Sequence, residues 1–80
     1  MKITVKQKHI DKGEKAKAMS CPIALAIKDY YWFPRRVVVG HCCCFIGKNM
    51  DKTYPLPKEV TNFIQNFDMG LEVKPFSFEI

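Results

Sequence analysis

The residues best suited to chemistry are four cysteines and two histidines, unevenly spread over 80 residues. Cys21 stands alone, whereas His41 directly precedes Cys42, Cys43 and Cys44. A nucleophilic Cys–His pair needs its two side chains within hydrogen-bond reach, and residue type alone does not single out one pair. A helix N-terminus would lower the pKa of the Cys21 thiol, yet burial as a small hydrophobic residue is the favoured interpretation.

The cysteine spacing does not match a disulfide framework or a zinc motif. Adjacent residues of a strand point to opposite faces, so we expect Cys42 and Cys44 on one side and Cys43 on the other. Zinc sites favour C-x₂₋₄-C pairs, which this chain lacks. A site assembled in space with His9 or His41 stays open. The sequence predicts no metal or cofactor, and a cytoplasmic, reducing compartment.

Other catalytic patterns are also missing. The eight acidic residues form no local carboxylate pair, and Ile46-Gly47-Lys48-Asn49 lacks the second glycine of a phosphate-binding loop. Neither a nucleophile–base pair nor a metal set is recognisable. We therefore predict that the protein is not an enzyme.

An aromatic and arginine-rich segment is the clearest candidate for binding. Tyr30, Tyr31, Trp32 and Phe33 are followed by Pro34-Arg35-Arg36. Four consecutive aromatic residues at the end of a helix cannot all face one core, and exposed Tyr, Trp and Arg are enriched at binding hot spots. The partner-binding residues predicted from this segment are Tyr31, Trp32, Arg35 and Arg36. The alternative is that the cluster closes one end of the core.

The basic charge lies near the N-terminus. The chain carries 13 Lys and Arg against eight Asp and Glu, a net charge of +5. Six of these basic residues fall within residues 1–17, against Asp11 and Glu14. Such a cluster suits an anionic partner, or serves solubility alone. The candidate nucleic-acid-binding residues are Lys2, Lys6, Lys8, Lys12, Lys15 and Lys17.

Length and composition indicate one small domain over residues 1–80. The hydrophobic fraction is 48% and the charged fraction 26%, both ordinary for a globular chain. No apolar run approaches a membrane span, and the first residues lack the hydrophobic block of a signal peptide.

The periodicity predicts an α+β fold. Five segments have the residue pattern of strands: Lys2–Lys6, Val37–Val39, Cys42–Ile46, Lys52–Leu56 and Phe76–Ile80. Gly40 marks either a bulge in one strand or a turn between two strands. A helical turn is expected near Ile10. A first amphipathic helix is expected to begin at Ser20-Cys21-Pro22, where Ser20 can serve as the N-cap. Its apolar face consists of Ile23, Ala26, Ile27 and Tyr30, and it is expected to end at Phe33-Pro34. A second amphipathic helix is expected to begin at Pro57 and to end at Gly70. Its apolar face consists of Val60, Phe63, Ile64 and Phe67.

The expected layout is a small, mainly antiparallel sheet with both amphipathic helices on one face. The element order is β-α-β-(β)-β-α-β, where the bracketed strand depends on Gly40. This order is compatible with a ferredoxin-like arrangement.

Three stretches carry a resemblance: KITVKQKHID, SCPIALAIKD and YPLPKEVTNFIQNFDMGLEVKPFSFEI. Together they resemble a group of small uncharacterised proteins of bacteria and their phages, with a Cys-Pro before an apolar helix and a Leu-Pro, Phe-Asp, Pro-Phe ending. The resemblance leaves out Tyr31–Asp51. It implies a cytoplasmic, phage-type accessory protein and brings no activity, cofactor or catalytic residue.

Two functions follow from these patterns. The first is a module that binds a host or cognate protein, or a second copy of itself, through the aromatic and arginine residues. The second is a small basic nucleic-acid-binding protein that uses the N-terminal lysines. The scarcity of arginine favours the first, because specific readers of bases prefer the guanidinium group.

Overall fold

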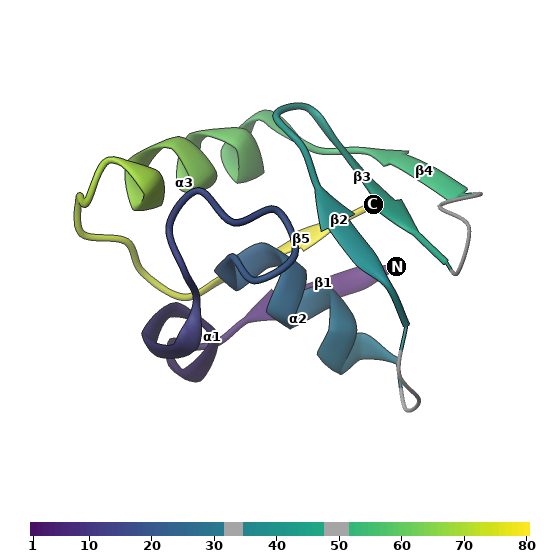
Figure 1. Ribbon diagram of the computed structural model, residues 1–80, viewed down its shortest axis with the longest axis horizontal. Helices are drawn as coiled ribbons and strands as arrows, with labels where there is room; N and C mark the ends of the chain where they lie inside the picture. Colours follow the sequence, from purple (N-terminus) through teal and green to yellow (C-terminus); the bar gives the residue numbers. More distant parts are fainter. Residues whose placement is uncertain (32–34, 48–51) are drawn as a thin grey trace.

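The computed structural model describes residues 1–31, 35–47 and 52–80, and Figure 1 shows how its elements are arranged. Within these residues the elements are, in order, β1 (Lys2–Val5), α1 (Gln7–Lys12), α2 (Pro22–Tyr30), β2 (Val37–Val39), β3 (Cys43–Ile46), β4 (Lys52–Pro55), α3 (Lys58–Asp68) and β5 (Phe76–Glu79). The described strands pair antiparallel. The fold is therefore α+β, and apart from the short helix α1 the element order is the predicted one.

The strands form two sheets rather than the single sheet that we expected. The first and last strands pair with each other, with Ile3 opposite Phe78 and Val5 opposite Phe76. The second sheet has the strand order β2-β3-β4. A βαβ unit requires parallel strands joined by a crossover, and the described strands form no parallel pair, so the ferredoxin-like arrangement is not present. Both sheets bury one face in a shared core, so they need not join edge to edge.

The segment around Gly40 is a turn between two paired strands. Val37 lies opposite Ile46 and Val39 opposite Cys44, and the Gly40 amide donates a hydrogen bond to the Cys43 carbonyl at 2.8 Å. β4 lies at the outer edge of this sheet. Pro55 at its end is consistent with an edge position, because proline cannot donate to a neighbouring strand.

The N-cap of helix α2 lies one residue later than predicted. Cys21 rather than Ser20 is the N-cap, and its Sγ accepts a hydrogen bond from the Ala24 amide at 3.4 Å. The helix ends at Tyr30, so the predicted terminator Phe33-Pro34 lies beyond it and outside the described residues. The Tyr30 side chain is 51% exposed rather than part of the buried face.

Helix α3 agrees closely with its prediction. Pro57 is the N-cap, and Val60, Phe63 and Phe67 are buried. Gly70 has a φ of +81°, the left-handed conformation in which glycine commonly follows a helix end. The Phe63 ring lies 4.9 Å from the Phe76 ring of β5, measured between centroids.

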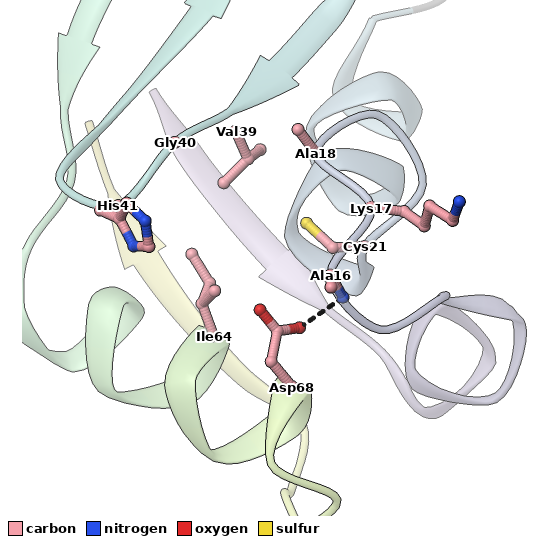
Figure 2. Close-up of a pocket in the computed structure, with 9 residues that line it drawn as sticks. All are labelled: Ala16, Lys17, Ala18, Cys21, Val39, Gly40, His41, Ile64 and Asp68. Carbon is pink, nitrogen blue, oxygen red and sulfur yellow. Dashed lines mark hydrogen bonds between the residues drawn. The ribbon is translucent and has the colours of Figure 1, made fainter.

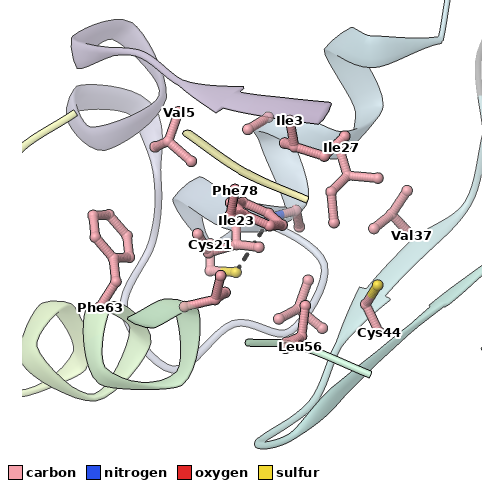
Figure 3. Packing of buried hydrophobic residues seen from close by; sticks show 14 of the residues in the cluster. Ile3, Val5, Cys21, Ile23, Ile27, Val37, Cys44, Leu56, Phe63 and Phe78 are labelled. Carbon is pink, nitrogen blue, oxygen red and sulfur yellow. Dashed lines mark hydrogen bonds between the residues drawn. The ribbon is translucent and has the colours of Figure 1, made fainter. Parts of the chain in front are cut away.

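The core lies where the two sheets and the helices α2 and α3 meet (Figure 3). Its most fully buried large side chains come from both sheets and both helices; they are Ile3, Ile23, Ile27, Ile46, Val5, Val37 and Val60. The predicted helical turn near Ile10 is α1, which packs on α2. None of the helices in the described part of the chain is long and apolar enough to cross a membrane.

Candidate functional site

Of the predicted aromatic residues, Tyr30 and Tyr31 lie at the end of α2. The Tyr30 and Tyr31 rings meet edge to face, with centroids 5.3 Å apart. Tyr31 packs at the border of the core, and its hydroxyl donates to the Met1 sulfur at 3.7 Å. Burial raises the pKa of Tyr31, so the phenol stays neutral near pH 7. Tyr31 is therefore a fixed support, and Tyr30 is the exposed ring.

The arginine that precedes β2 completes this arrangement. The Arg35 guanidinium carbon lies 4.7 Å from the centroid of the Tyr31 ring, within cation–π range. Arg36 is exposed, and its carbonyl accepts a hydrogen bond from the Gly47 amide at 3.0 Å. We call Tyr30, Tyr31, Arg35 and Arg36 the aromatic–arginine patch. Trp32, predicted to belong to the same site, lies outside the described residues.

The six candidate lysines are exposed and occupy three successive parts of the chain. Lys2 is on β1, Lys6 caps α1, Lys8 and Lys12 are on α1, and Lys15 and Lys17 follow it. Acidic residues lie beside two of these: Lys2 is opposite Glu79 on β5, and the Lys8 ammonium is 3.3 Å from Asp29 Oδ2. The positive charge is thus spread along the chain and partly offset.

His9 is buried, and both of its ring nitrogens are engaged. Nδ1 accepts a hydrogen bond from the Lys6 amide at 2.9 Å, and Nε2 lies 2.7 Å from Asp29 Oδ2. Because Nδ1 is an acceptor, Nε2 carries the proton and donates to the carboxylate. This imidazole has no free nitrogen with which to act on a substrate, and its role is to join α1 to α2.

A pocket of about 380 Å³ opens between the loop after α1, the β2–β3 turn and α3 (Figure 2). Its lining residues are Ala16, Lys17, Ala18, Cys21, Val39, Gly40, His41, Ile64 and Asp68. Asp68 Oδ1 accepts a hydrogen bond from the Ala16 amide at 2.9 Å. Ala16 has a φ of +56°, an uncommon conformation for a residue with a Cβ. Asp68 therefore holds this loop against α3.

Cys21 and His41 line the same pocket but do not form a catalytic pair. Figure 2 shows them on opposite sides, with Ile64 between them. Burial raises the pKa of the Cys21 thiol, despite its place at a helix N-terminus. The thiol is therefore neutral near pH 7 and acts as a helix cap.

The cysteine triplet differs from its predicted alternation. Cys44 is buried and Cys43 partly exposed, as expected for neighbours on a strand, but Cys42 is exposed in the turn rather than beside Cys44. The reason is that β3 begins only at Cys43 and the chain bends before it. Within residues 1–31, 35–47 and 52–80, no group of three or more His, Cys, Asp or Glu side chains is placed to hold a metal ion.

Comparison with protein-family models, curated proteins and solved structures found no match for this chain. The candidate site therefore stands on geometry alone. Tyr31, Arg35 and Arg36 were predicted from the sequence as binding residues, and the structure places them in one patch; the contacts made by Tyr30, His9 and Asp68 were not predicted. Of these three residues, Tyr30 alone belonged to a sequence pattern that predicted binding, the aromatic run.

Proposed function

We propose that the protein is a non-catalytic binding module whose aromatic–arginine patch docks on another protein. The observation that carries this proposal is the Arg35 guanidinium stacked on Tyr31, beside the half-exposed ring of Tyr30. Tyr and Arg are the residue types that most often dominate binding energy at interfaces.

The order already present in the patch supports this role. Tyr31 is held by the core and by Met1, so it supports Tyr30 and Arg35 before any partner arrives. Side chains that are ordered in the free protein lose less conformational entropy on binding. The chemistry suits a partner surface with an apolar centre for Tyr30 and carboxylates for Arg35 and Arg36.

A role without catalysis agrees with the candidate chemical groups. Both nitrogens of His9 are engaged, and the pKa of the Cys21 thiol is raised. The four free thiols and the absence of a disulfide-type spacing support a reducing compartment such as the cytoplasm. A phage-type accessory protein that occupies a host or cognate protein fits these properties, and self-association through the same patch belongs to the same class of function.

Nucleic-acid binding is the second candidate, and the exposure of all six N-terminal lysines favours it. If about four to six of them contact duplex phosphates, the logarithm of the binding constant falls with the logarithm of salt at a slope near −4 to −5. Replacing Lys6 and Lys8 by Glu then abolishes binding.

The test uses the tagged protein to capture binding partners from a lysate of the source cells. One half of the lysate is treated with nuclease and the other is not, and each is washed at low and at high salt. The proposal predicts a discrete protein that survives both treatments and is lost with Tyr30→Ala and Arg35→Ala. Leu71→Ala is the matched control, because Leu71 is 53% exposed and belongs to the segment after α3. Figure 1 shows the end of α3 far from the end of α2. Material that disappears with nuclease and salt would instead support nucleic-acid binding through the lysines.

A further inference from the structure

The pocket between the loop after α1, the β2–β3 turn and α3 continues into a second hollow along α3. The second hollow has a volume of about 460 Å³, and His41, Ile64 and Asp68 line both. Ligand sites usually enclose about 300–1,000 Å³. The first pocket, at about 380 Å³, is therefore large enough by itself for a small organic molecule.

The inside of this pocket is mostly apolar. Cys21 and Val39 are its most buried lining residues, and Ile64 of α3 is partly buried. Cys21 contributes no charge near pH 7, because burial raises the pKa of its thiol. Figure 2 shows the Lys17 side chain directed away from the pocket. A bound molecule therefore meets a surface that suits an apolar group.

Asp68 places one carboxylate beside this apolar surface. Its Oδ1 atom accepts the hydrogen bond from the Ala16 amide, and Figure 2 shows the other carboxylate oxygen turned toward the inside of the pocket. In the part of the chain that the structure describes, neither Lys15 nor Lys17 forms an ion pair with Asp68. The second oxygen is thus a charged acceptor that faces the pocket without a cation of this chain.

The place of Asp68 in α3 is unfavourable for a negative charge. Asp68 is the last residue of this 11-residue helix, and the last turn contains no basic residue. The C-terminal end of a helix carries a partial negative charge that favours cations. The carboxylate and the helix end therefore both attract a positive charge to the same position.

The wall of the pocket is held in place before any ligand binds. The loop after α1 is attached to α3 through Ala16 and Asp68, and to β2 because the Val39 amide donates to the Ala18 carbonyl at 2.9 Å. Ala16 has a φ of +56°, and such a conformation persists only where the surrounding structure fixes it. A preformed site loses less conformational entropy on binding.

We propose that this pocket binds a small organic ammonium ion with an apolar body. The ammonium group donates a hydrogen bond to the second oxygen of Asp68, and the apolar body packs on Ile64 and Val39. An anion of the same shape is repelled by the carboxylate and by the helix end. A neutral molecule lacks the charge of the ammonium donor and forms a weaker hydrogen bond.

The experiment follows the backbone amide resonances of the protein by NMR during titration with three molecules of similar shape. These are the cation phenethylamine, the neutral phenethyl alcohol and the anion hydrocinnamate, and butylamine and benzylamine extend the set of amines. We expect phenethylamine to give saturable shifts at Ala16, Gly40 and Ile64. The alcohol should bind about tenfold more weakly, as for the loss of one charge-assisted hydrogen bond, and hydrocinnamate should leave these resonances unchanged.

Asp68→Asn separates the charge from the loop contact. The oxygen of an Asn side chain can still accept from the Ala16 amide, so the fold should be retained, which circular dichroism checks. The amine should then bind no more tightly than the alcohol. Asp11→Asn is the matched control, because it makes the same change of charge at an exposed residue of α1 outside the pocket. This control should bind the amine as the unsubstituted protein does.

The proposal is overturned if none of the three amines gives saturable shifts at the pocket, or if hydrocinnamate binds as tightly as phenethylamine. It is also overturned if folded Asp68→Asn keeps the affinity of the unsubstituted protein. The pocket shares no residue with the aromatic–arginine patch, and Tyr30→Ala should not change the affinity for the amine. The two proposals therefore fail or succeed separately.

Discussion

The His9 imidazole donates a hydrogen bond from Nε2 to Asp29, across 2.7 Å, and so joins α1 to α2. The other nitrogen, Nδ1, accepts from the Lys6 amide at the start of α1. A six-residue helix is too short to be stable by itself. The position of α1 therefore depends on its contacts with the rest of the fold, and His9, which is only 4% exposed, is its buried residue.

Replacing His9 should destabilise the protein more than replacing a neighbouring surface residue. His9→Ala removes both hydrogen bonds and leaves the Lys6 amide without its partner, at an expected cost of about 1–3 kcal/mol in the free energy of unfolding. Lys8→Ala removes only an exposed ion pair, worth about 0–1 kcal/mol. Urea denaturation measures both values, and an equal effect of the two substitutions would contradict this role for His9.

Acid should weaken the same contact. The hydrogen bond from His9, and then Lys8, hold the pKa of Asp29 below its usual value of 3.8. A carboxyl group whose pKa is lowered by folding stabilises the folded state above its unfolded pKa, and this stabilisation is lost as the pH falls through the folded value. Melting temperatures from pH 6 to pH 2 should therefore fall less steeply for Asp29→Asn than for the unsubstituted protein. Parallel curves would show that Asp29 makes no such contribution.

The four thiols should react in a fixed order. Cys42 is exposed, whereas Cys44 is fully buried and burial raises its pKa to about 11. Ellman's reagent should modify Cys42 first, and Cys21 and Cys44 only at the rate at which the protein unfolds. Peptide mass spectrometry after partial labelling identifies the sites. Early labelling of Cys44 would contradict its buried position on β3.

Gly13 should not tolerate a side chain. A Cβ at this position would lie 2.6 Å from the Pro22 ring at the start of α2. Gly13→Ala therefore forces a shift between the loop and α2, with an expected loss of about 1–3 kcal/mol of stability. Gly40→Ala is the milder comparison, since its Cβ would lie 3.2 Å from the Cys43 carbonyl oxygen. Chemical denaturation should rank Gly13→Ala as the less stable variant.

The sequence predicted those features that depend on local pattern. The apolar spacing of Val60, Phe63 and Phe67 identified the buried face of α3, and alternation identified Phe78 as an inward-facing residue of β5. It did not predict that β1 pairs with β5 apart from the other strands. That pairing depends on how the helices bring the two ends of the chain together, which no local pattern records.

The same distinction applies to the candidate site. The run of aromatic and arginine residues made Tyr31 and Arg35 candidates, but their stacking depends on how the start of β2 lies beside the end of α2. The bond between Ala16 and Asp68 spans 52 positions, and neither residue carries a sequence signal for it. The exposure of Cys42 depends on a bend immediately before β3, whereas the sequence favoured regular alternation.

The most direct test of the proposed function is photo-crosslinking in source cells, with a benzophenone amino acid in place of Tyr30. Leu71, an exposed residue in the segment after α3, carries the same group as the control. The account predicts one discrete protein adduct from position 30 that is absent from position 71 and lost when Arg35→Ala is added. Identical products from both positions, or adducts with nucleic acid alone, would contradict the claim that the aromatic–arginine patch binds a protein.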